Sequence, residues 1–128
     1  MTTTKITWFG HAAFCISTNN TRIYIDPWLA GNPKCPAELS YPTKHQPTSI
    51  LLTHGHSDLV GSTVALLKAN PSCKLYAIYE LADAIGHAEG VKEDQIIGLN
   101  KGGTVLIDEG ISATRSEERR VGKECRSR

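Results

Sequence analysis

The chain has 128 residues, of which 40% are hydrophobic and 21% charged, and its formal net charge is +1. This length allows one domain with a modest core, and the composition is that of an ordinary globular protein. No apolar run is long enough to span a bilayer, and residues 1–5 lack the apolar stretch of a signal peptide. The four cysteines form no Cys-x-x-Cys pair, which argues against a zinc ribbon and against a secreted disulfide framework. We therefore expect a cytoplasmic protein that does not enter a membrane.

The first part of the chain predicts three short strands that follow one another as a β-meander. The strands are expected at residues 6–9, 13–17 and 22–25, where apolar and β-branched residues are bounded by turn residues. Residues 28–48 contain four prolines and are expected to form a long loop. A loop of this length is either a lid or wall for a substrate, or a packed surface excursion.

The second part of the chain predicts strands that alternate with helices. A buried strand is expected at 49–53, helices at 62–68 and 80–88, and further strands at 74–78, 96–97 and 105–107. Strands and helices that alternate after a β-meander predict an α/β fold (α+β layered), in which one layer of helices covers a sheet.

The most informative motif follows directly after the strand expected at 49–53. His54, His56 and Asp58 place two imidazoles and a carboxylate within five residues, and these groups are ligands of zinc and similar ions. In an extended segment, residues i and i+2 project the same way, so His54 and His56 can hold one ion from one side. A polar loop with two solvated histidines is the competing interpretation. The pattern favours a divalent metal, with Zn²⁺ first and Mn²⁺ or Fe²⁺ as alternatives.

The stretch from His54 to Asp58 resembles the His-x-His-x-Asp-His signature of the metallo-β-lactamase fold superfamily, and within it the UlaG-like, UPF0173-type metal-dependent hydrolases. Supporting motifs at residues 8–14, 25–28, 31–33 and 100–104 occur in the order of that family. The resemblance implies the N-terminal αβ half of an αββα sandwich. It also implies a hydrolase that uses a metal-activated water on a small ester, lactone, amide or phosphodiester.

The resemblance assigns a role to each candidate site residue. His54 and His56 would bind the first metal, while Asp58 would bind the second and orient the attacking water. Asp26 matches the aspartate of the first family motif and would hydrogen-bond the metal loop, although a turn carboxylate before Pro27 is nearly as good an interpretation. His11 matches the histidine of the first turn, where it would bind substrate or stabilise developing charge, unless it is only a hydrogen-bonded turn histidine.

Two positions depart from the family pattern. Leu59 stands where the signature has its last histidine, and Ser62 stands where an aspartate often follows. Because leucine has no lone pair to donate, one ligand of the second metal site is missing. The alternative function is therefore a metal-binding or degenerate domain without catalysis.

Residues 115–128 differ in composition from the rest. They carry six basic and three acidic residues and a single valine, so without them the net charge is −2 (8 basic minus 10 acidic residues). A basic tail normally suggests nucleic acid, but this one resembles the translation of a sequencing adapter. We expect a partial metallo-β-lactamase-like domain over 1–114 and a non-native tail over 115–128, with no nucleic-acid partner. Nothing in the sequence indicates an oligomeric state.

Overall fold

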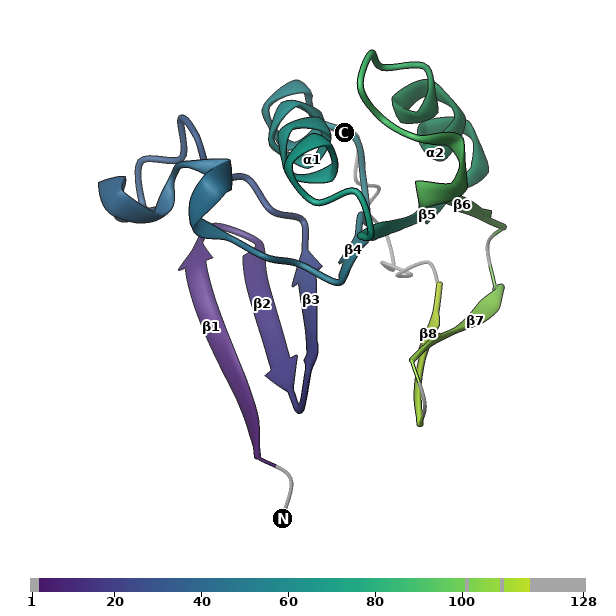
Figure 1. Cartoon of the computed structure of the whole chain (residues 1–128), viewed down its shortest axis with the longest axis horizontal. Helices are drawn as coiled ribbons and strands as arrows, with labels where there is room; N and C mark the ends of the chain where they lie inside the picture. The colour runs from purple at the N-terminus through teal and green to yellow at the C-terminus, as the bar shows by residue number, and fades with distance from the viewer. Residues whose placement is uncertain (1–2, 101, 109, 116–128) are drawn as a thin grey trace, which may run out of the picture.

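The computed structural model describes residues 3–100, 102–108 and 110–115 (Figure 1). The side chains of Ser57, Asp58 and Leu59 lie outside this description. Within the described ranges, strands β1 to β6 form one sheet in sequential order, and β7 and β8 form a separate hairpin. The strands are β1 (Thr4–Gly10), β2 (Ala13–Thr18), β3 (Thr21–Ile25), β4 (Ser49–Leu51), β5 (Lys74–Ile78), β6 (Ile96–Leu99), β7 (Thr104–Asp108) and β8 (Ile111–Thr114).

The two α-helices connect parallel strands and lie on the same side of the sheet (Figure 1). Strands β1 to β3 are antiparallel, whereas β3 to β6 are parallel. No helix in the described part of the chain is long and apolar enough to cross a membrane. The helices are α1 (Ser57–Ala69) and α2 (Tyr79–Gly86), and the short 3₁₀ helices are η1 (Ala37–Leu39), η2 (Pro42–Lys44) and η3 (Glu93–Gln95).

The architecture confirms the predicted α/β class and the opening β-meander, and it corrects several element bounds. The first helix begins at Ser57 rather than at 62, and it includes Leu59, Val60 and Gly61 ahead of the apolar run at 64–67 from which the helix was predicted. Strand β4 ends at Leu51 rather than at 53. Strand β8 was not predicted, and it pairs with β7 outside the main sheet. Its alternation of half-buried and exposed residues is short and weak, which explains why the sequence did not indicate it.

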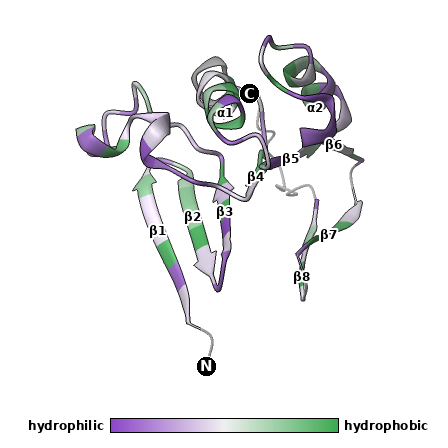
Figure 2. Ribbon diagram, in the orientation of Figure 1, coloured by the Kyte–Doolittle hydropathy of each residue, from purple (hydrophilic) through white to green (hydrophobic). Residues whose placement is uncertain are grey.

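The core lies between the sheet and the two helices. Ile50 and Leu75 on the central strands are fully buried against Leu66 and Leu67 of α1 and Ile85 of α2. Figure 2 shows hydrophobic residues along β1 and β2 and on α1. This packing fixes the start of α1 relative to the ends of β3 and β4, where the candidate site lies.

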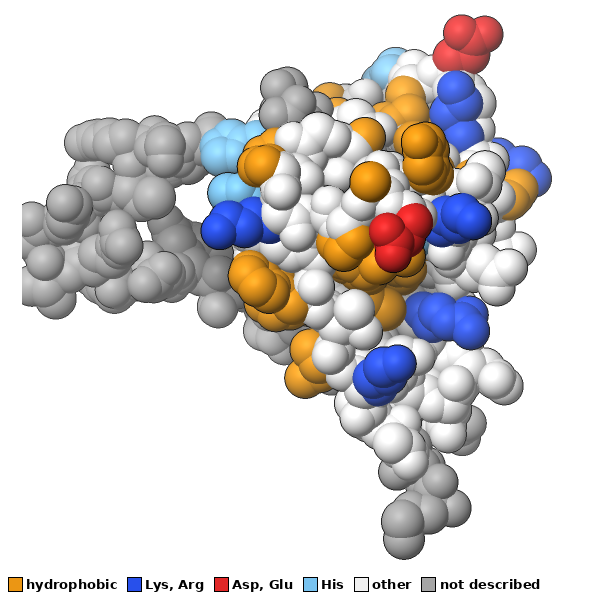
Figure 3. Space-filling model, turned by 90° about the vertical axis from the view of Figure 1, so that its left-hand side faces the viewer, with side chains coloured by type: hydrophobic (Ala, Val, Ile, Leu, Met, Phe, Trp, Pro, Cys, Tyr) orange, Lys and Arg blue, Asp and Glu red, His pale blue; other side chains and the backbone are white. Residues whose placement is uncertain are grey.

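The opposite face of β1 and β2 is apolar but open. Trp8 pairs with Phe14 across these strands, so the two side chains share a face. Ile6 is 66% exposed and Trp8 58%, whereas Phe9, which points the other way, is buried. Figure 3, which views the molecule from the β1 side, shows hydrophobic side chains in several groups at this surface. An exposed apolar patch of this kind marks a surface that another layer of protein can cover.

Gln95 joins the end of α1 to the parallel strands. It is fully buried, and its Nε2 donates to the carbonyl oxygens of Leu67 (3.1 Å), Asn70 (3.0 Å) and Cys73 (3.0 Å). Its Oε1 accepts from the Lys92 backbone N–H at 2.9 Å. One side chain therefore satisfies several backbone groups that water does not reach.

We expect Gln95→Leu to lower the free energy of unfolding by at least about 2 kcal/mol, because it leaves buried backbone groups without partners. Chemical denaturation measures this, with the exposed neighbour Glu93→Gln as the matched control. An unchanged denaturation midpoint for the leucine variant would show that the Gln95 network does not stabilise the fold.

Candidate metal centre

The candidate site lies at the carboxyl ends of β3 and β4 and at the start of α1. The two strands are parallel neighbours, with Ile25 opposite Leu51, so their carboxyl ends meet at one edge of the sheet. Asp26 follows β3, and the segment 53–56, here called the metal loop, links β4 to the first residue of α1. The fold thus brings together two motifs that are 27 residues apart in sequence.

Asp26 holds the metal loop in place. Its side chain is buried, and its carboxylate accepts from the Thr53 backbone N–H at 2.8 Å and from the Thr53 hydroxyl at 2.6 Å. Its own N–H donates to the Leu51 carbonyl at 2.9 Å. The backbone of Asp26 has a φ of 46°, a conformation that aspartate tolerates better than most residues. The carboxylate is therefore directed at the loop by a fixed backbone turn.

The two predicted imidazole ligands lie side by side. The ring centroids of His54 and His56 are 4.5 Å apart, and the ring planes meet at 82°. The His54 side chain is 33% exposed, and its Nδ1 lies 2.8 Å from the Thr53 hydroxyl oxygen. Two imidazole rings at this separation can supply two of the ligands of one divalent ion. Among the described residues, no group of three histidine, cysteine, aspartate or glutamate side chains is placed to hold a metal.

Asp58 belongs to a helix rather than to the loop expected from the sequence. It lies in the first turn of α1, where the helix dipole favours a carboxylate. Its side chain and that of Leu59 lie outside the described part of the structure. The ligand role of Asp58 therefore stays a prediction.

His11 is placed in a separate contact group. Its backbone has a φ of 54°, and its ring packs on Trp28 with centroids 4.9 Å apart. The Trp8 indole N–H donates to the His11 carbonyl at 2.7 Å. Within the described ranges, no hydrogen bond or ring contact joins His11 to His54 or His56. These contacts describe a well-held turn histidine, and its catalytic role stays a prediction.

Cysteine thiols are poorly suited to complete the metal site. Cys15, Cys35 and Cys73 are free and buried. Burial raises the pKa of all three thiols, and that of Cys73 reaches about 12. Because the thiolate is the form that binds metal, these raised pKa values disfavour sulfur ligation.

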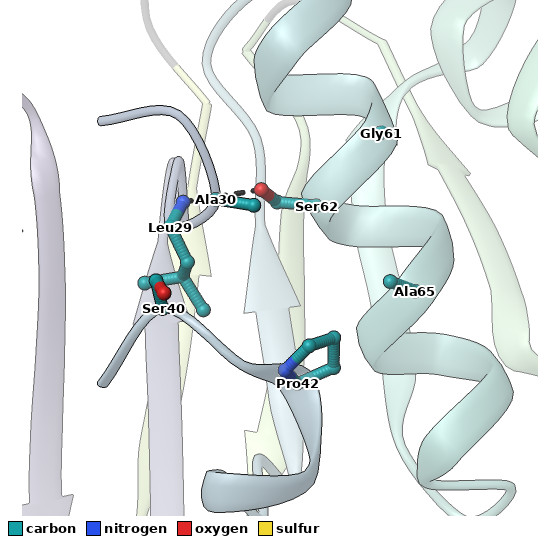
Figure 4. A pocket seen from close by; sticks show the side chains of 7 residues that line it. All are labelled: Leu29, Ala30, Ser40, Pro42, Gly61, Ser62 and Ala65. Carbon is teal, nitrogen blue, oxygen red and sulfur yellow. Dashed lines mark hydrogen bonds between the residues drawn. The ribbon is translucent and has the colours of Figure 1, made fainter. Parts of the chain in front are cut away.

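A hollow lies beside α1, the helix that follows the metal loop. It has a volume of about 220 Å³ and lies between the long loop and the helix (Figure 4). The Ser62 hydroxyl, which points into the gap, accepts from the Leu29 backbone N–H at 3.1 Å. Ser62 therefore anchors the loop at the position where the family pattern often has an aspartate. The residues that line the hollow are Leu29, Ala30, Ser40, Pro42, Gly61, Ser62 and Ala65.

The sequence did not indicate the hydrogen bonds that Thr53 makes within the site or those that Arg115 makes to the backbone at the metal loop. Thr53 bridges Asp26 and His54. In the sequence, this bridge is indicated only by a hydroxyl residue that precedes a histidine at the end of a buried strand. Arg115 was assigned to the tail, yet its guanidinium donates to the carbonyl oxygens of Leu52 (3.4 Å) and Thr53 (3.3 Å). Its backbone also pairs with Gly102 and Gly103.

Comparisons with known proteins agree with this geometry. Residues 5–123 match the pattern of the beta-lactamase superfamily domain. The chain is 38% identical over 104 residues to a UPF0173 metal-dependent hydrolase of Saccharolobus solfataricus, covering 81% of this chain and 45% of that protein. It is 42% identical over 103 residues to one of Cereibacter sphaeroides, covering 80% and 43%.

A solved structure is also similar. The novel metallo hydrolase Igni18 from the hyperthermophilic archaeon Ignicoccus hospitalis KIN4/I superposes with a TM-score of 0.64 at 27% identity, covering 85% of this chain and 44% of that one. The chain thus spans less than half the length of the relatives that it matches.

We expect Asp26→Asn to lower the free energy of unfolding by about 1–3 kcal/mol, because an amide presents one oxygen to two Thr53 donors and leaves one of them unpaired. Asp26→Ala should cost more, since alanine also disfavours the positive φ. Denaturation with the exposed Asp83→Asn as control measures both. Equal stability of all three variants would rule out Asp26 as the anchor of the loop.

Proposed function

Because the chain belongs to the beta-lactamase superfamily, we propose that it is the N-terminal part of a metal-dependent hydrolase that binds a divalent ion through His54 and His56. The observation that carries this proposal is the edge-to-face contact of the two imidazoles at 4.5 Å, with His54 held through Thr53 by a buried carboxylate. The names of the similar UPF0173 proteins support the reaction class.

The imidazoles of His54 and His56 fit a divalent ion, but they do not complete its coordination. Two imidazoles are fewer than the three protein ligands of a typical catalytic zinc site. We assign a further ligand to Asp58 and the remainder to regions of the longer relatives that this chain does not match. Zinc is the proposed ion, because imidazole and carboxylate groups suit it.

The residues would act together on a small molecule. When bound, a divalent ion supplies an activated water at neutral pH and polarises the bond under attack. His54 and His56 would hold the ion, Asp58 would orient the water, and Asp26 fixes the loop. His11, whose ring packs on Trp28, would contact the substrate. Esters, lactones, amides and phosphodiesters all suit this chemistry.

The hollow beside α1 supports a small substrate. Its lining residue Gly61 lies about 6 Å along the helix axis from Ser57, the first residue of α1 after the metal loop. Its volume of about 220 Å³ is below the roughly 300–1,000 Å³ of most ligand pockets. It therefore suits one apolar group of a substrate rather than a whole molecule, and a cytoplasmic metabolite is the proposed class.

A metal-binding domain without catalysis is the second candidate function. Leu59 removes one ligand of the signature, and the Ser62 hydroxyl is engaged with the Leu29 backbone rather than free to serve a metal. On either function, residues 1–114 form the proposed partial domain and 115–128 the proposed non-native tail. The open apolar face of β1 and β2 is where we place the further layer of a complete protein.

Metal analysis after dialysis against Zn²⁺ tests the site. We expect at most one equivalent per chain, weakly held because the ion is under-coordinated. His54→Ala and His56→Ala should each weaken binding by more than the 10–100-fold typical of outer hydrogen-bonding partners. The exposed His87→Ala is the matched control and should bind as the unsubstituted chain does. Two tightly held ions, or equal binding by all variants, would contradict the proposal.

A second experiment separates the two candidate functions. We expect the chain alone to show little or no metal-dependent hydrolysis of generic ester, lactone or phosphodiester substrates. Joining it to the carboxyl-terminal part of a UPF0173 relative, with Leu59→His, should raise metal content and turnover together, because two-metal hydrolysis needs both ions to share the attacking water. Metal uptake without turnover in the joined protein would favour the non-catalytic domain.

A further inference from the structure

We infer that Thr53 is a positioning residue that fixes the tautomer of His54, so that the Nε2 atom of His54 is the one presented to the metal. This inference deepens the proposed function and rests on it for the identity of the ligand. The hydrogen-bond geometry itself is independent of any metal.

Thr53 is held at two points by Asp26. Its backbone N–H donates to one carboxylate oxygen at 2.8 Å, and its hydroxyl donates to the other at 2.6 Å. Leu51, which precedes the metal loop, in turn accepts from the Asp26 N–H. The orientation of the Thr53 hydroxyl is therefore fixed, because its proton is donated to the Asp26 carboxylate.

Because the Thr53 hydroxyl donates its proton to Asp26, it can only accept a hydrogen bond from His54. The Thr53 oxygen lies 2.8 Å from His54 Nδ1. A hydroxyl has one proton and two acceptor lone pairs, and a carboxylate can only accept. Since the Thr53 proton goes to Asp26, the hydrogen bond to His54 requires a proton on Nδ1. A neutral imidazole protonated on Nδ1 carries its free lone pair on Nε2.

Asp26 cannot fix this tautomer without the threonine. Its nearest oxygen is 3.9 Å from His54 Nδ1, which exceeds the roughly 2.7–3.2 Å of an N–H···O hydrogen bond. The Thr53 hydroxyl bridges this gap, since it donates to the carboxylate and accepts from His54 Nδ1. The negative charge of Asp26 thereby polarises the hydrogen bond to the His54 ring. An outer carboxylate that acts on a ligating histidine raises the basicity of the ligand nitrogen as well as orienting the ring.

His56 provides an internal comparison. Its ring contacts the ring of His54 at 82°, but the described part of the chain contains no hydrogen bond to either of its ring nitrogens. The described contacts therefore fix one tautomer for His54 and none for His56. Two histidines in the same loop should differ in a measurable way.

Long-range ¹H–¹⁵N NMR of the metal-free chain tests this, since it distinguishes protonated from unprotonated ring nitrogens. At a pH about two units above the ordinary histidine pKa of about 6.5, His54 should be protonated on Nδ1 and unprotonated on Nε2. In Thr53→Val, which replaces the hydroxyl by a methyl of similar size, His54 should become a mixture of tautomers. Thr53→Ser keeps the hydroxyl and should preserve the single tautomer.

Zinc binding gives the second readout. Thr53→Val should weaken it by about 10–100-fold, as for other partners of ligating histidines, while Thr53→Ser should stay within about threefold of the unsubstituted chain. A proton on His54 Nε2 in the unsubstituted chain would overturn the inference even if the valine variant did not fold. So would a valine variant with unchanged tautomer and affinity. If no variant binds zinc but the tautomer results hold, the proposed function fails and the positioning by Thr53 stands.

Discussion

The hydrogen bonds between the Asp26 carboxylate and Thr53 are the constraint on which the site depends. Together with the hydrogen bond from the Asp26 N–H to the Leu51 carbonyl, they hold the segment after β4 against the end of β3. The carboxylate is buried, so its charge must be satisfied inside the protein, and the Thr53 N–H and hydroxyl satisfy it. The hydrogen bonds that satisfy the buried carboxylate therefore also orient His54 through Thr53, and the His56 ring packs against the ring of His54.

The strand pairing and the helix packing bring Asp26 and Thr53 close enough to form these hydrogen bonds. The parallel pairing of β3 and β4 brings Asp26 and the metal loop to one edge, and the packing of Leu66 and Leu67 fixes the helix that follows the loop. Leu81 of α2 supports the loop from the side, since a Cβ on Gly55 would lie 2.9 Å from its Cδ1. The glycine between the two histidines therefore allows α2 to approach closely.

Several strands and the two metal-loop histidines were predictable from the sequence, because each depends on residues that are close together in the chain. Short runs of apolar and β-branched residues between turn residues predicted β1 to β3, and the spacing of His54 and His56 predicted neighbouring imidazoles. The bridge through Thr53 was not predictable, since it depends on register between β3 and β4 across 27 residues. The start of α1 was missed because the prediction rested on the apolar run at 64–67, and Gly61 just before that run disfavours a helix. The contacts of Arg115 were missed because composition alone assigned it to the tail.

If His54 and His56 together form the metal-binding part of this chain, the zinc neighbours must show it. X-ray absorption at the zinc edge, on the chain loaded with one equivalent of Zn²⁺, measures these neighbours. We expect two imidazole nitrogens at about 2.0–2.1 Å, with oxygen donors as the other neighbours. A sulfur neighbour at about 2.3 Å, or a first shell without imidazole, would contradict it, because the ion would then lie away from the metal loop.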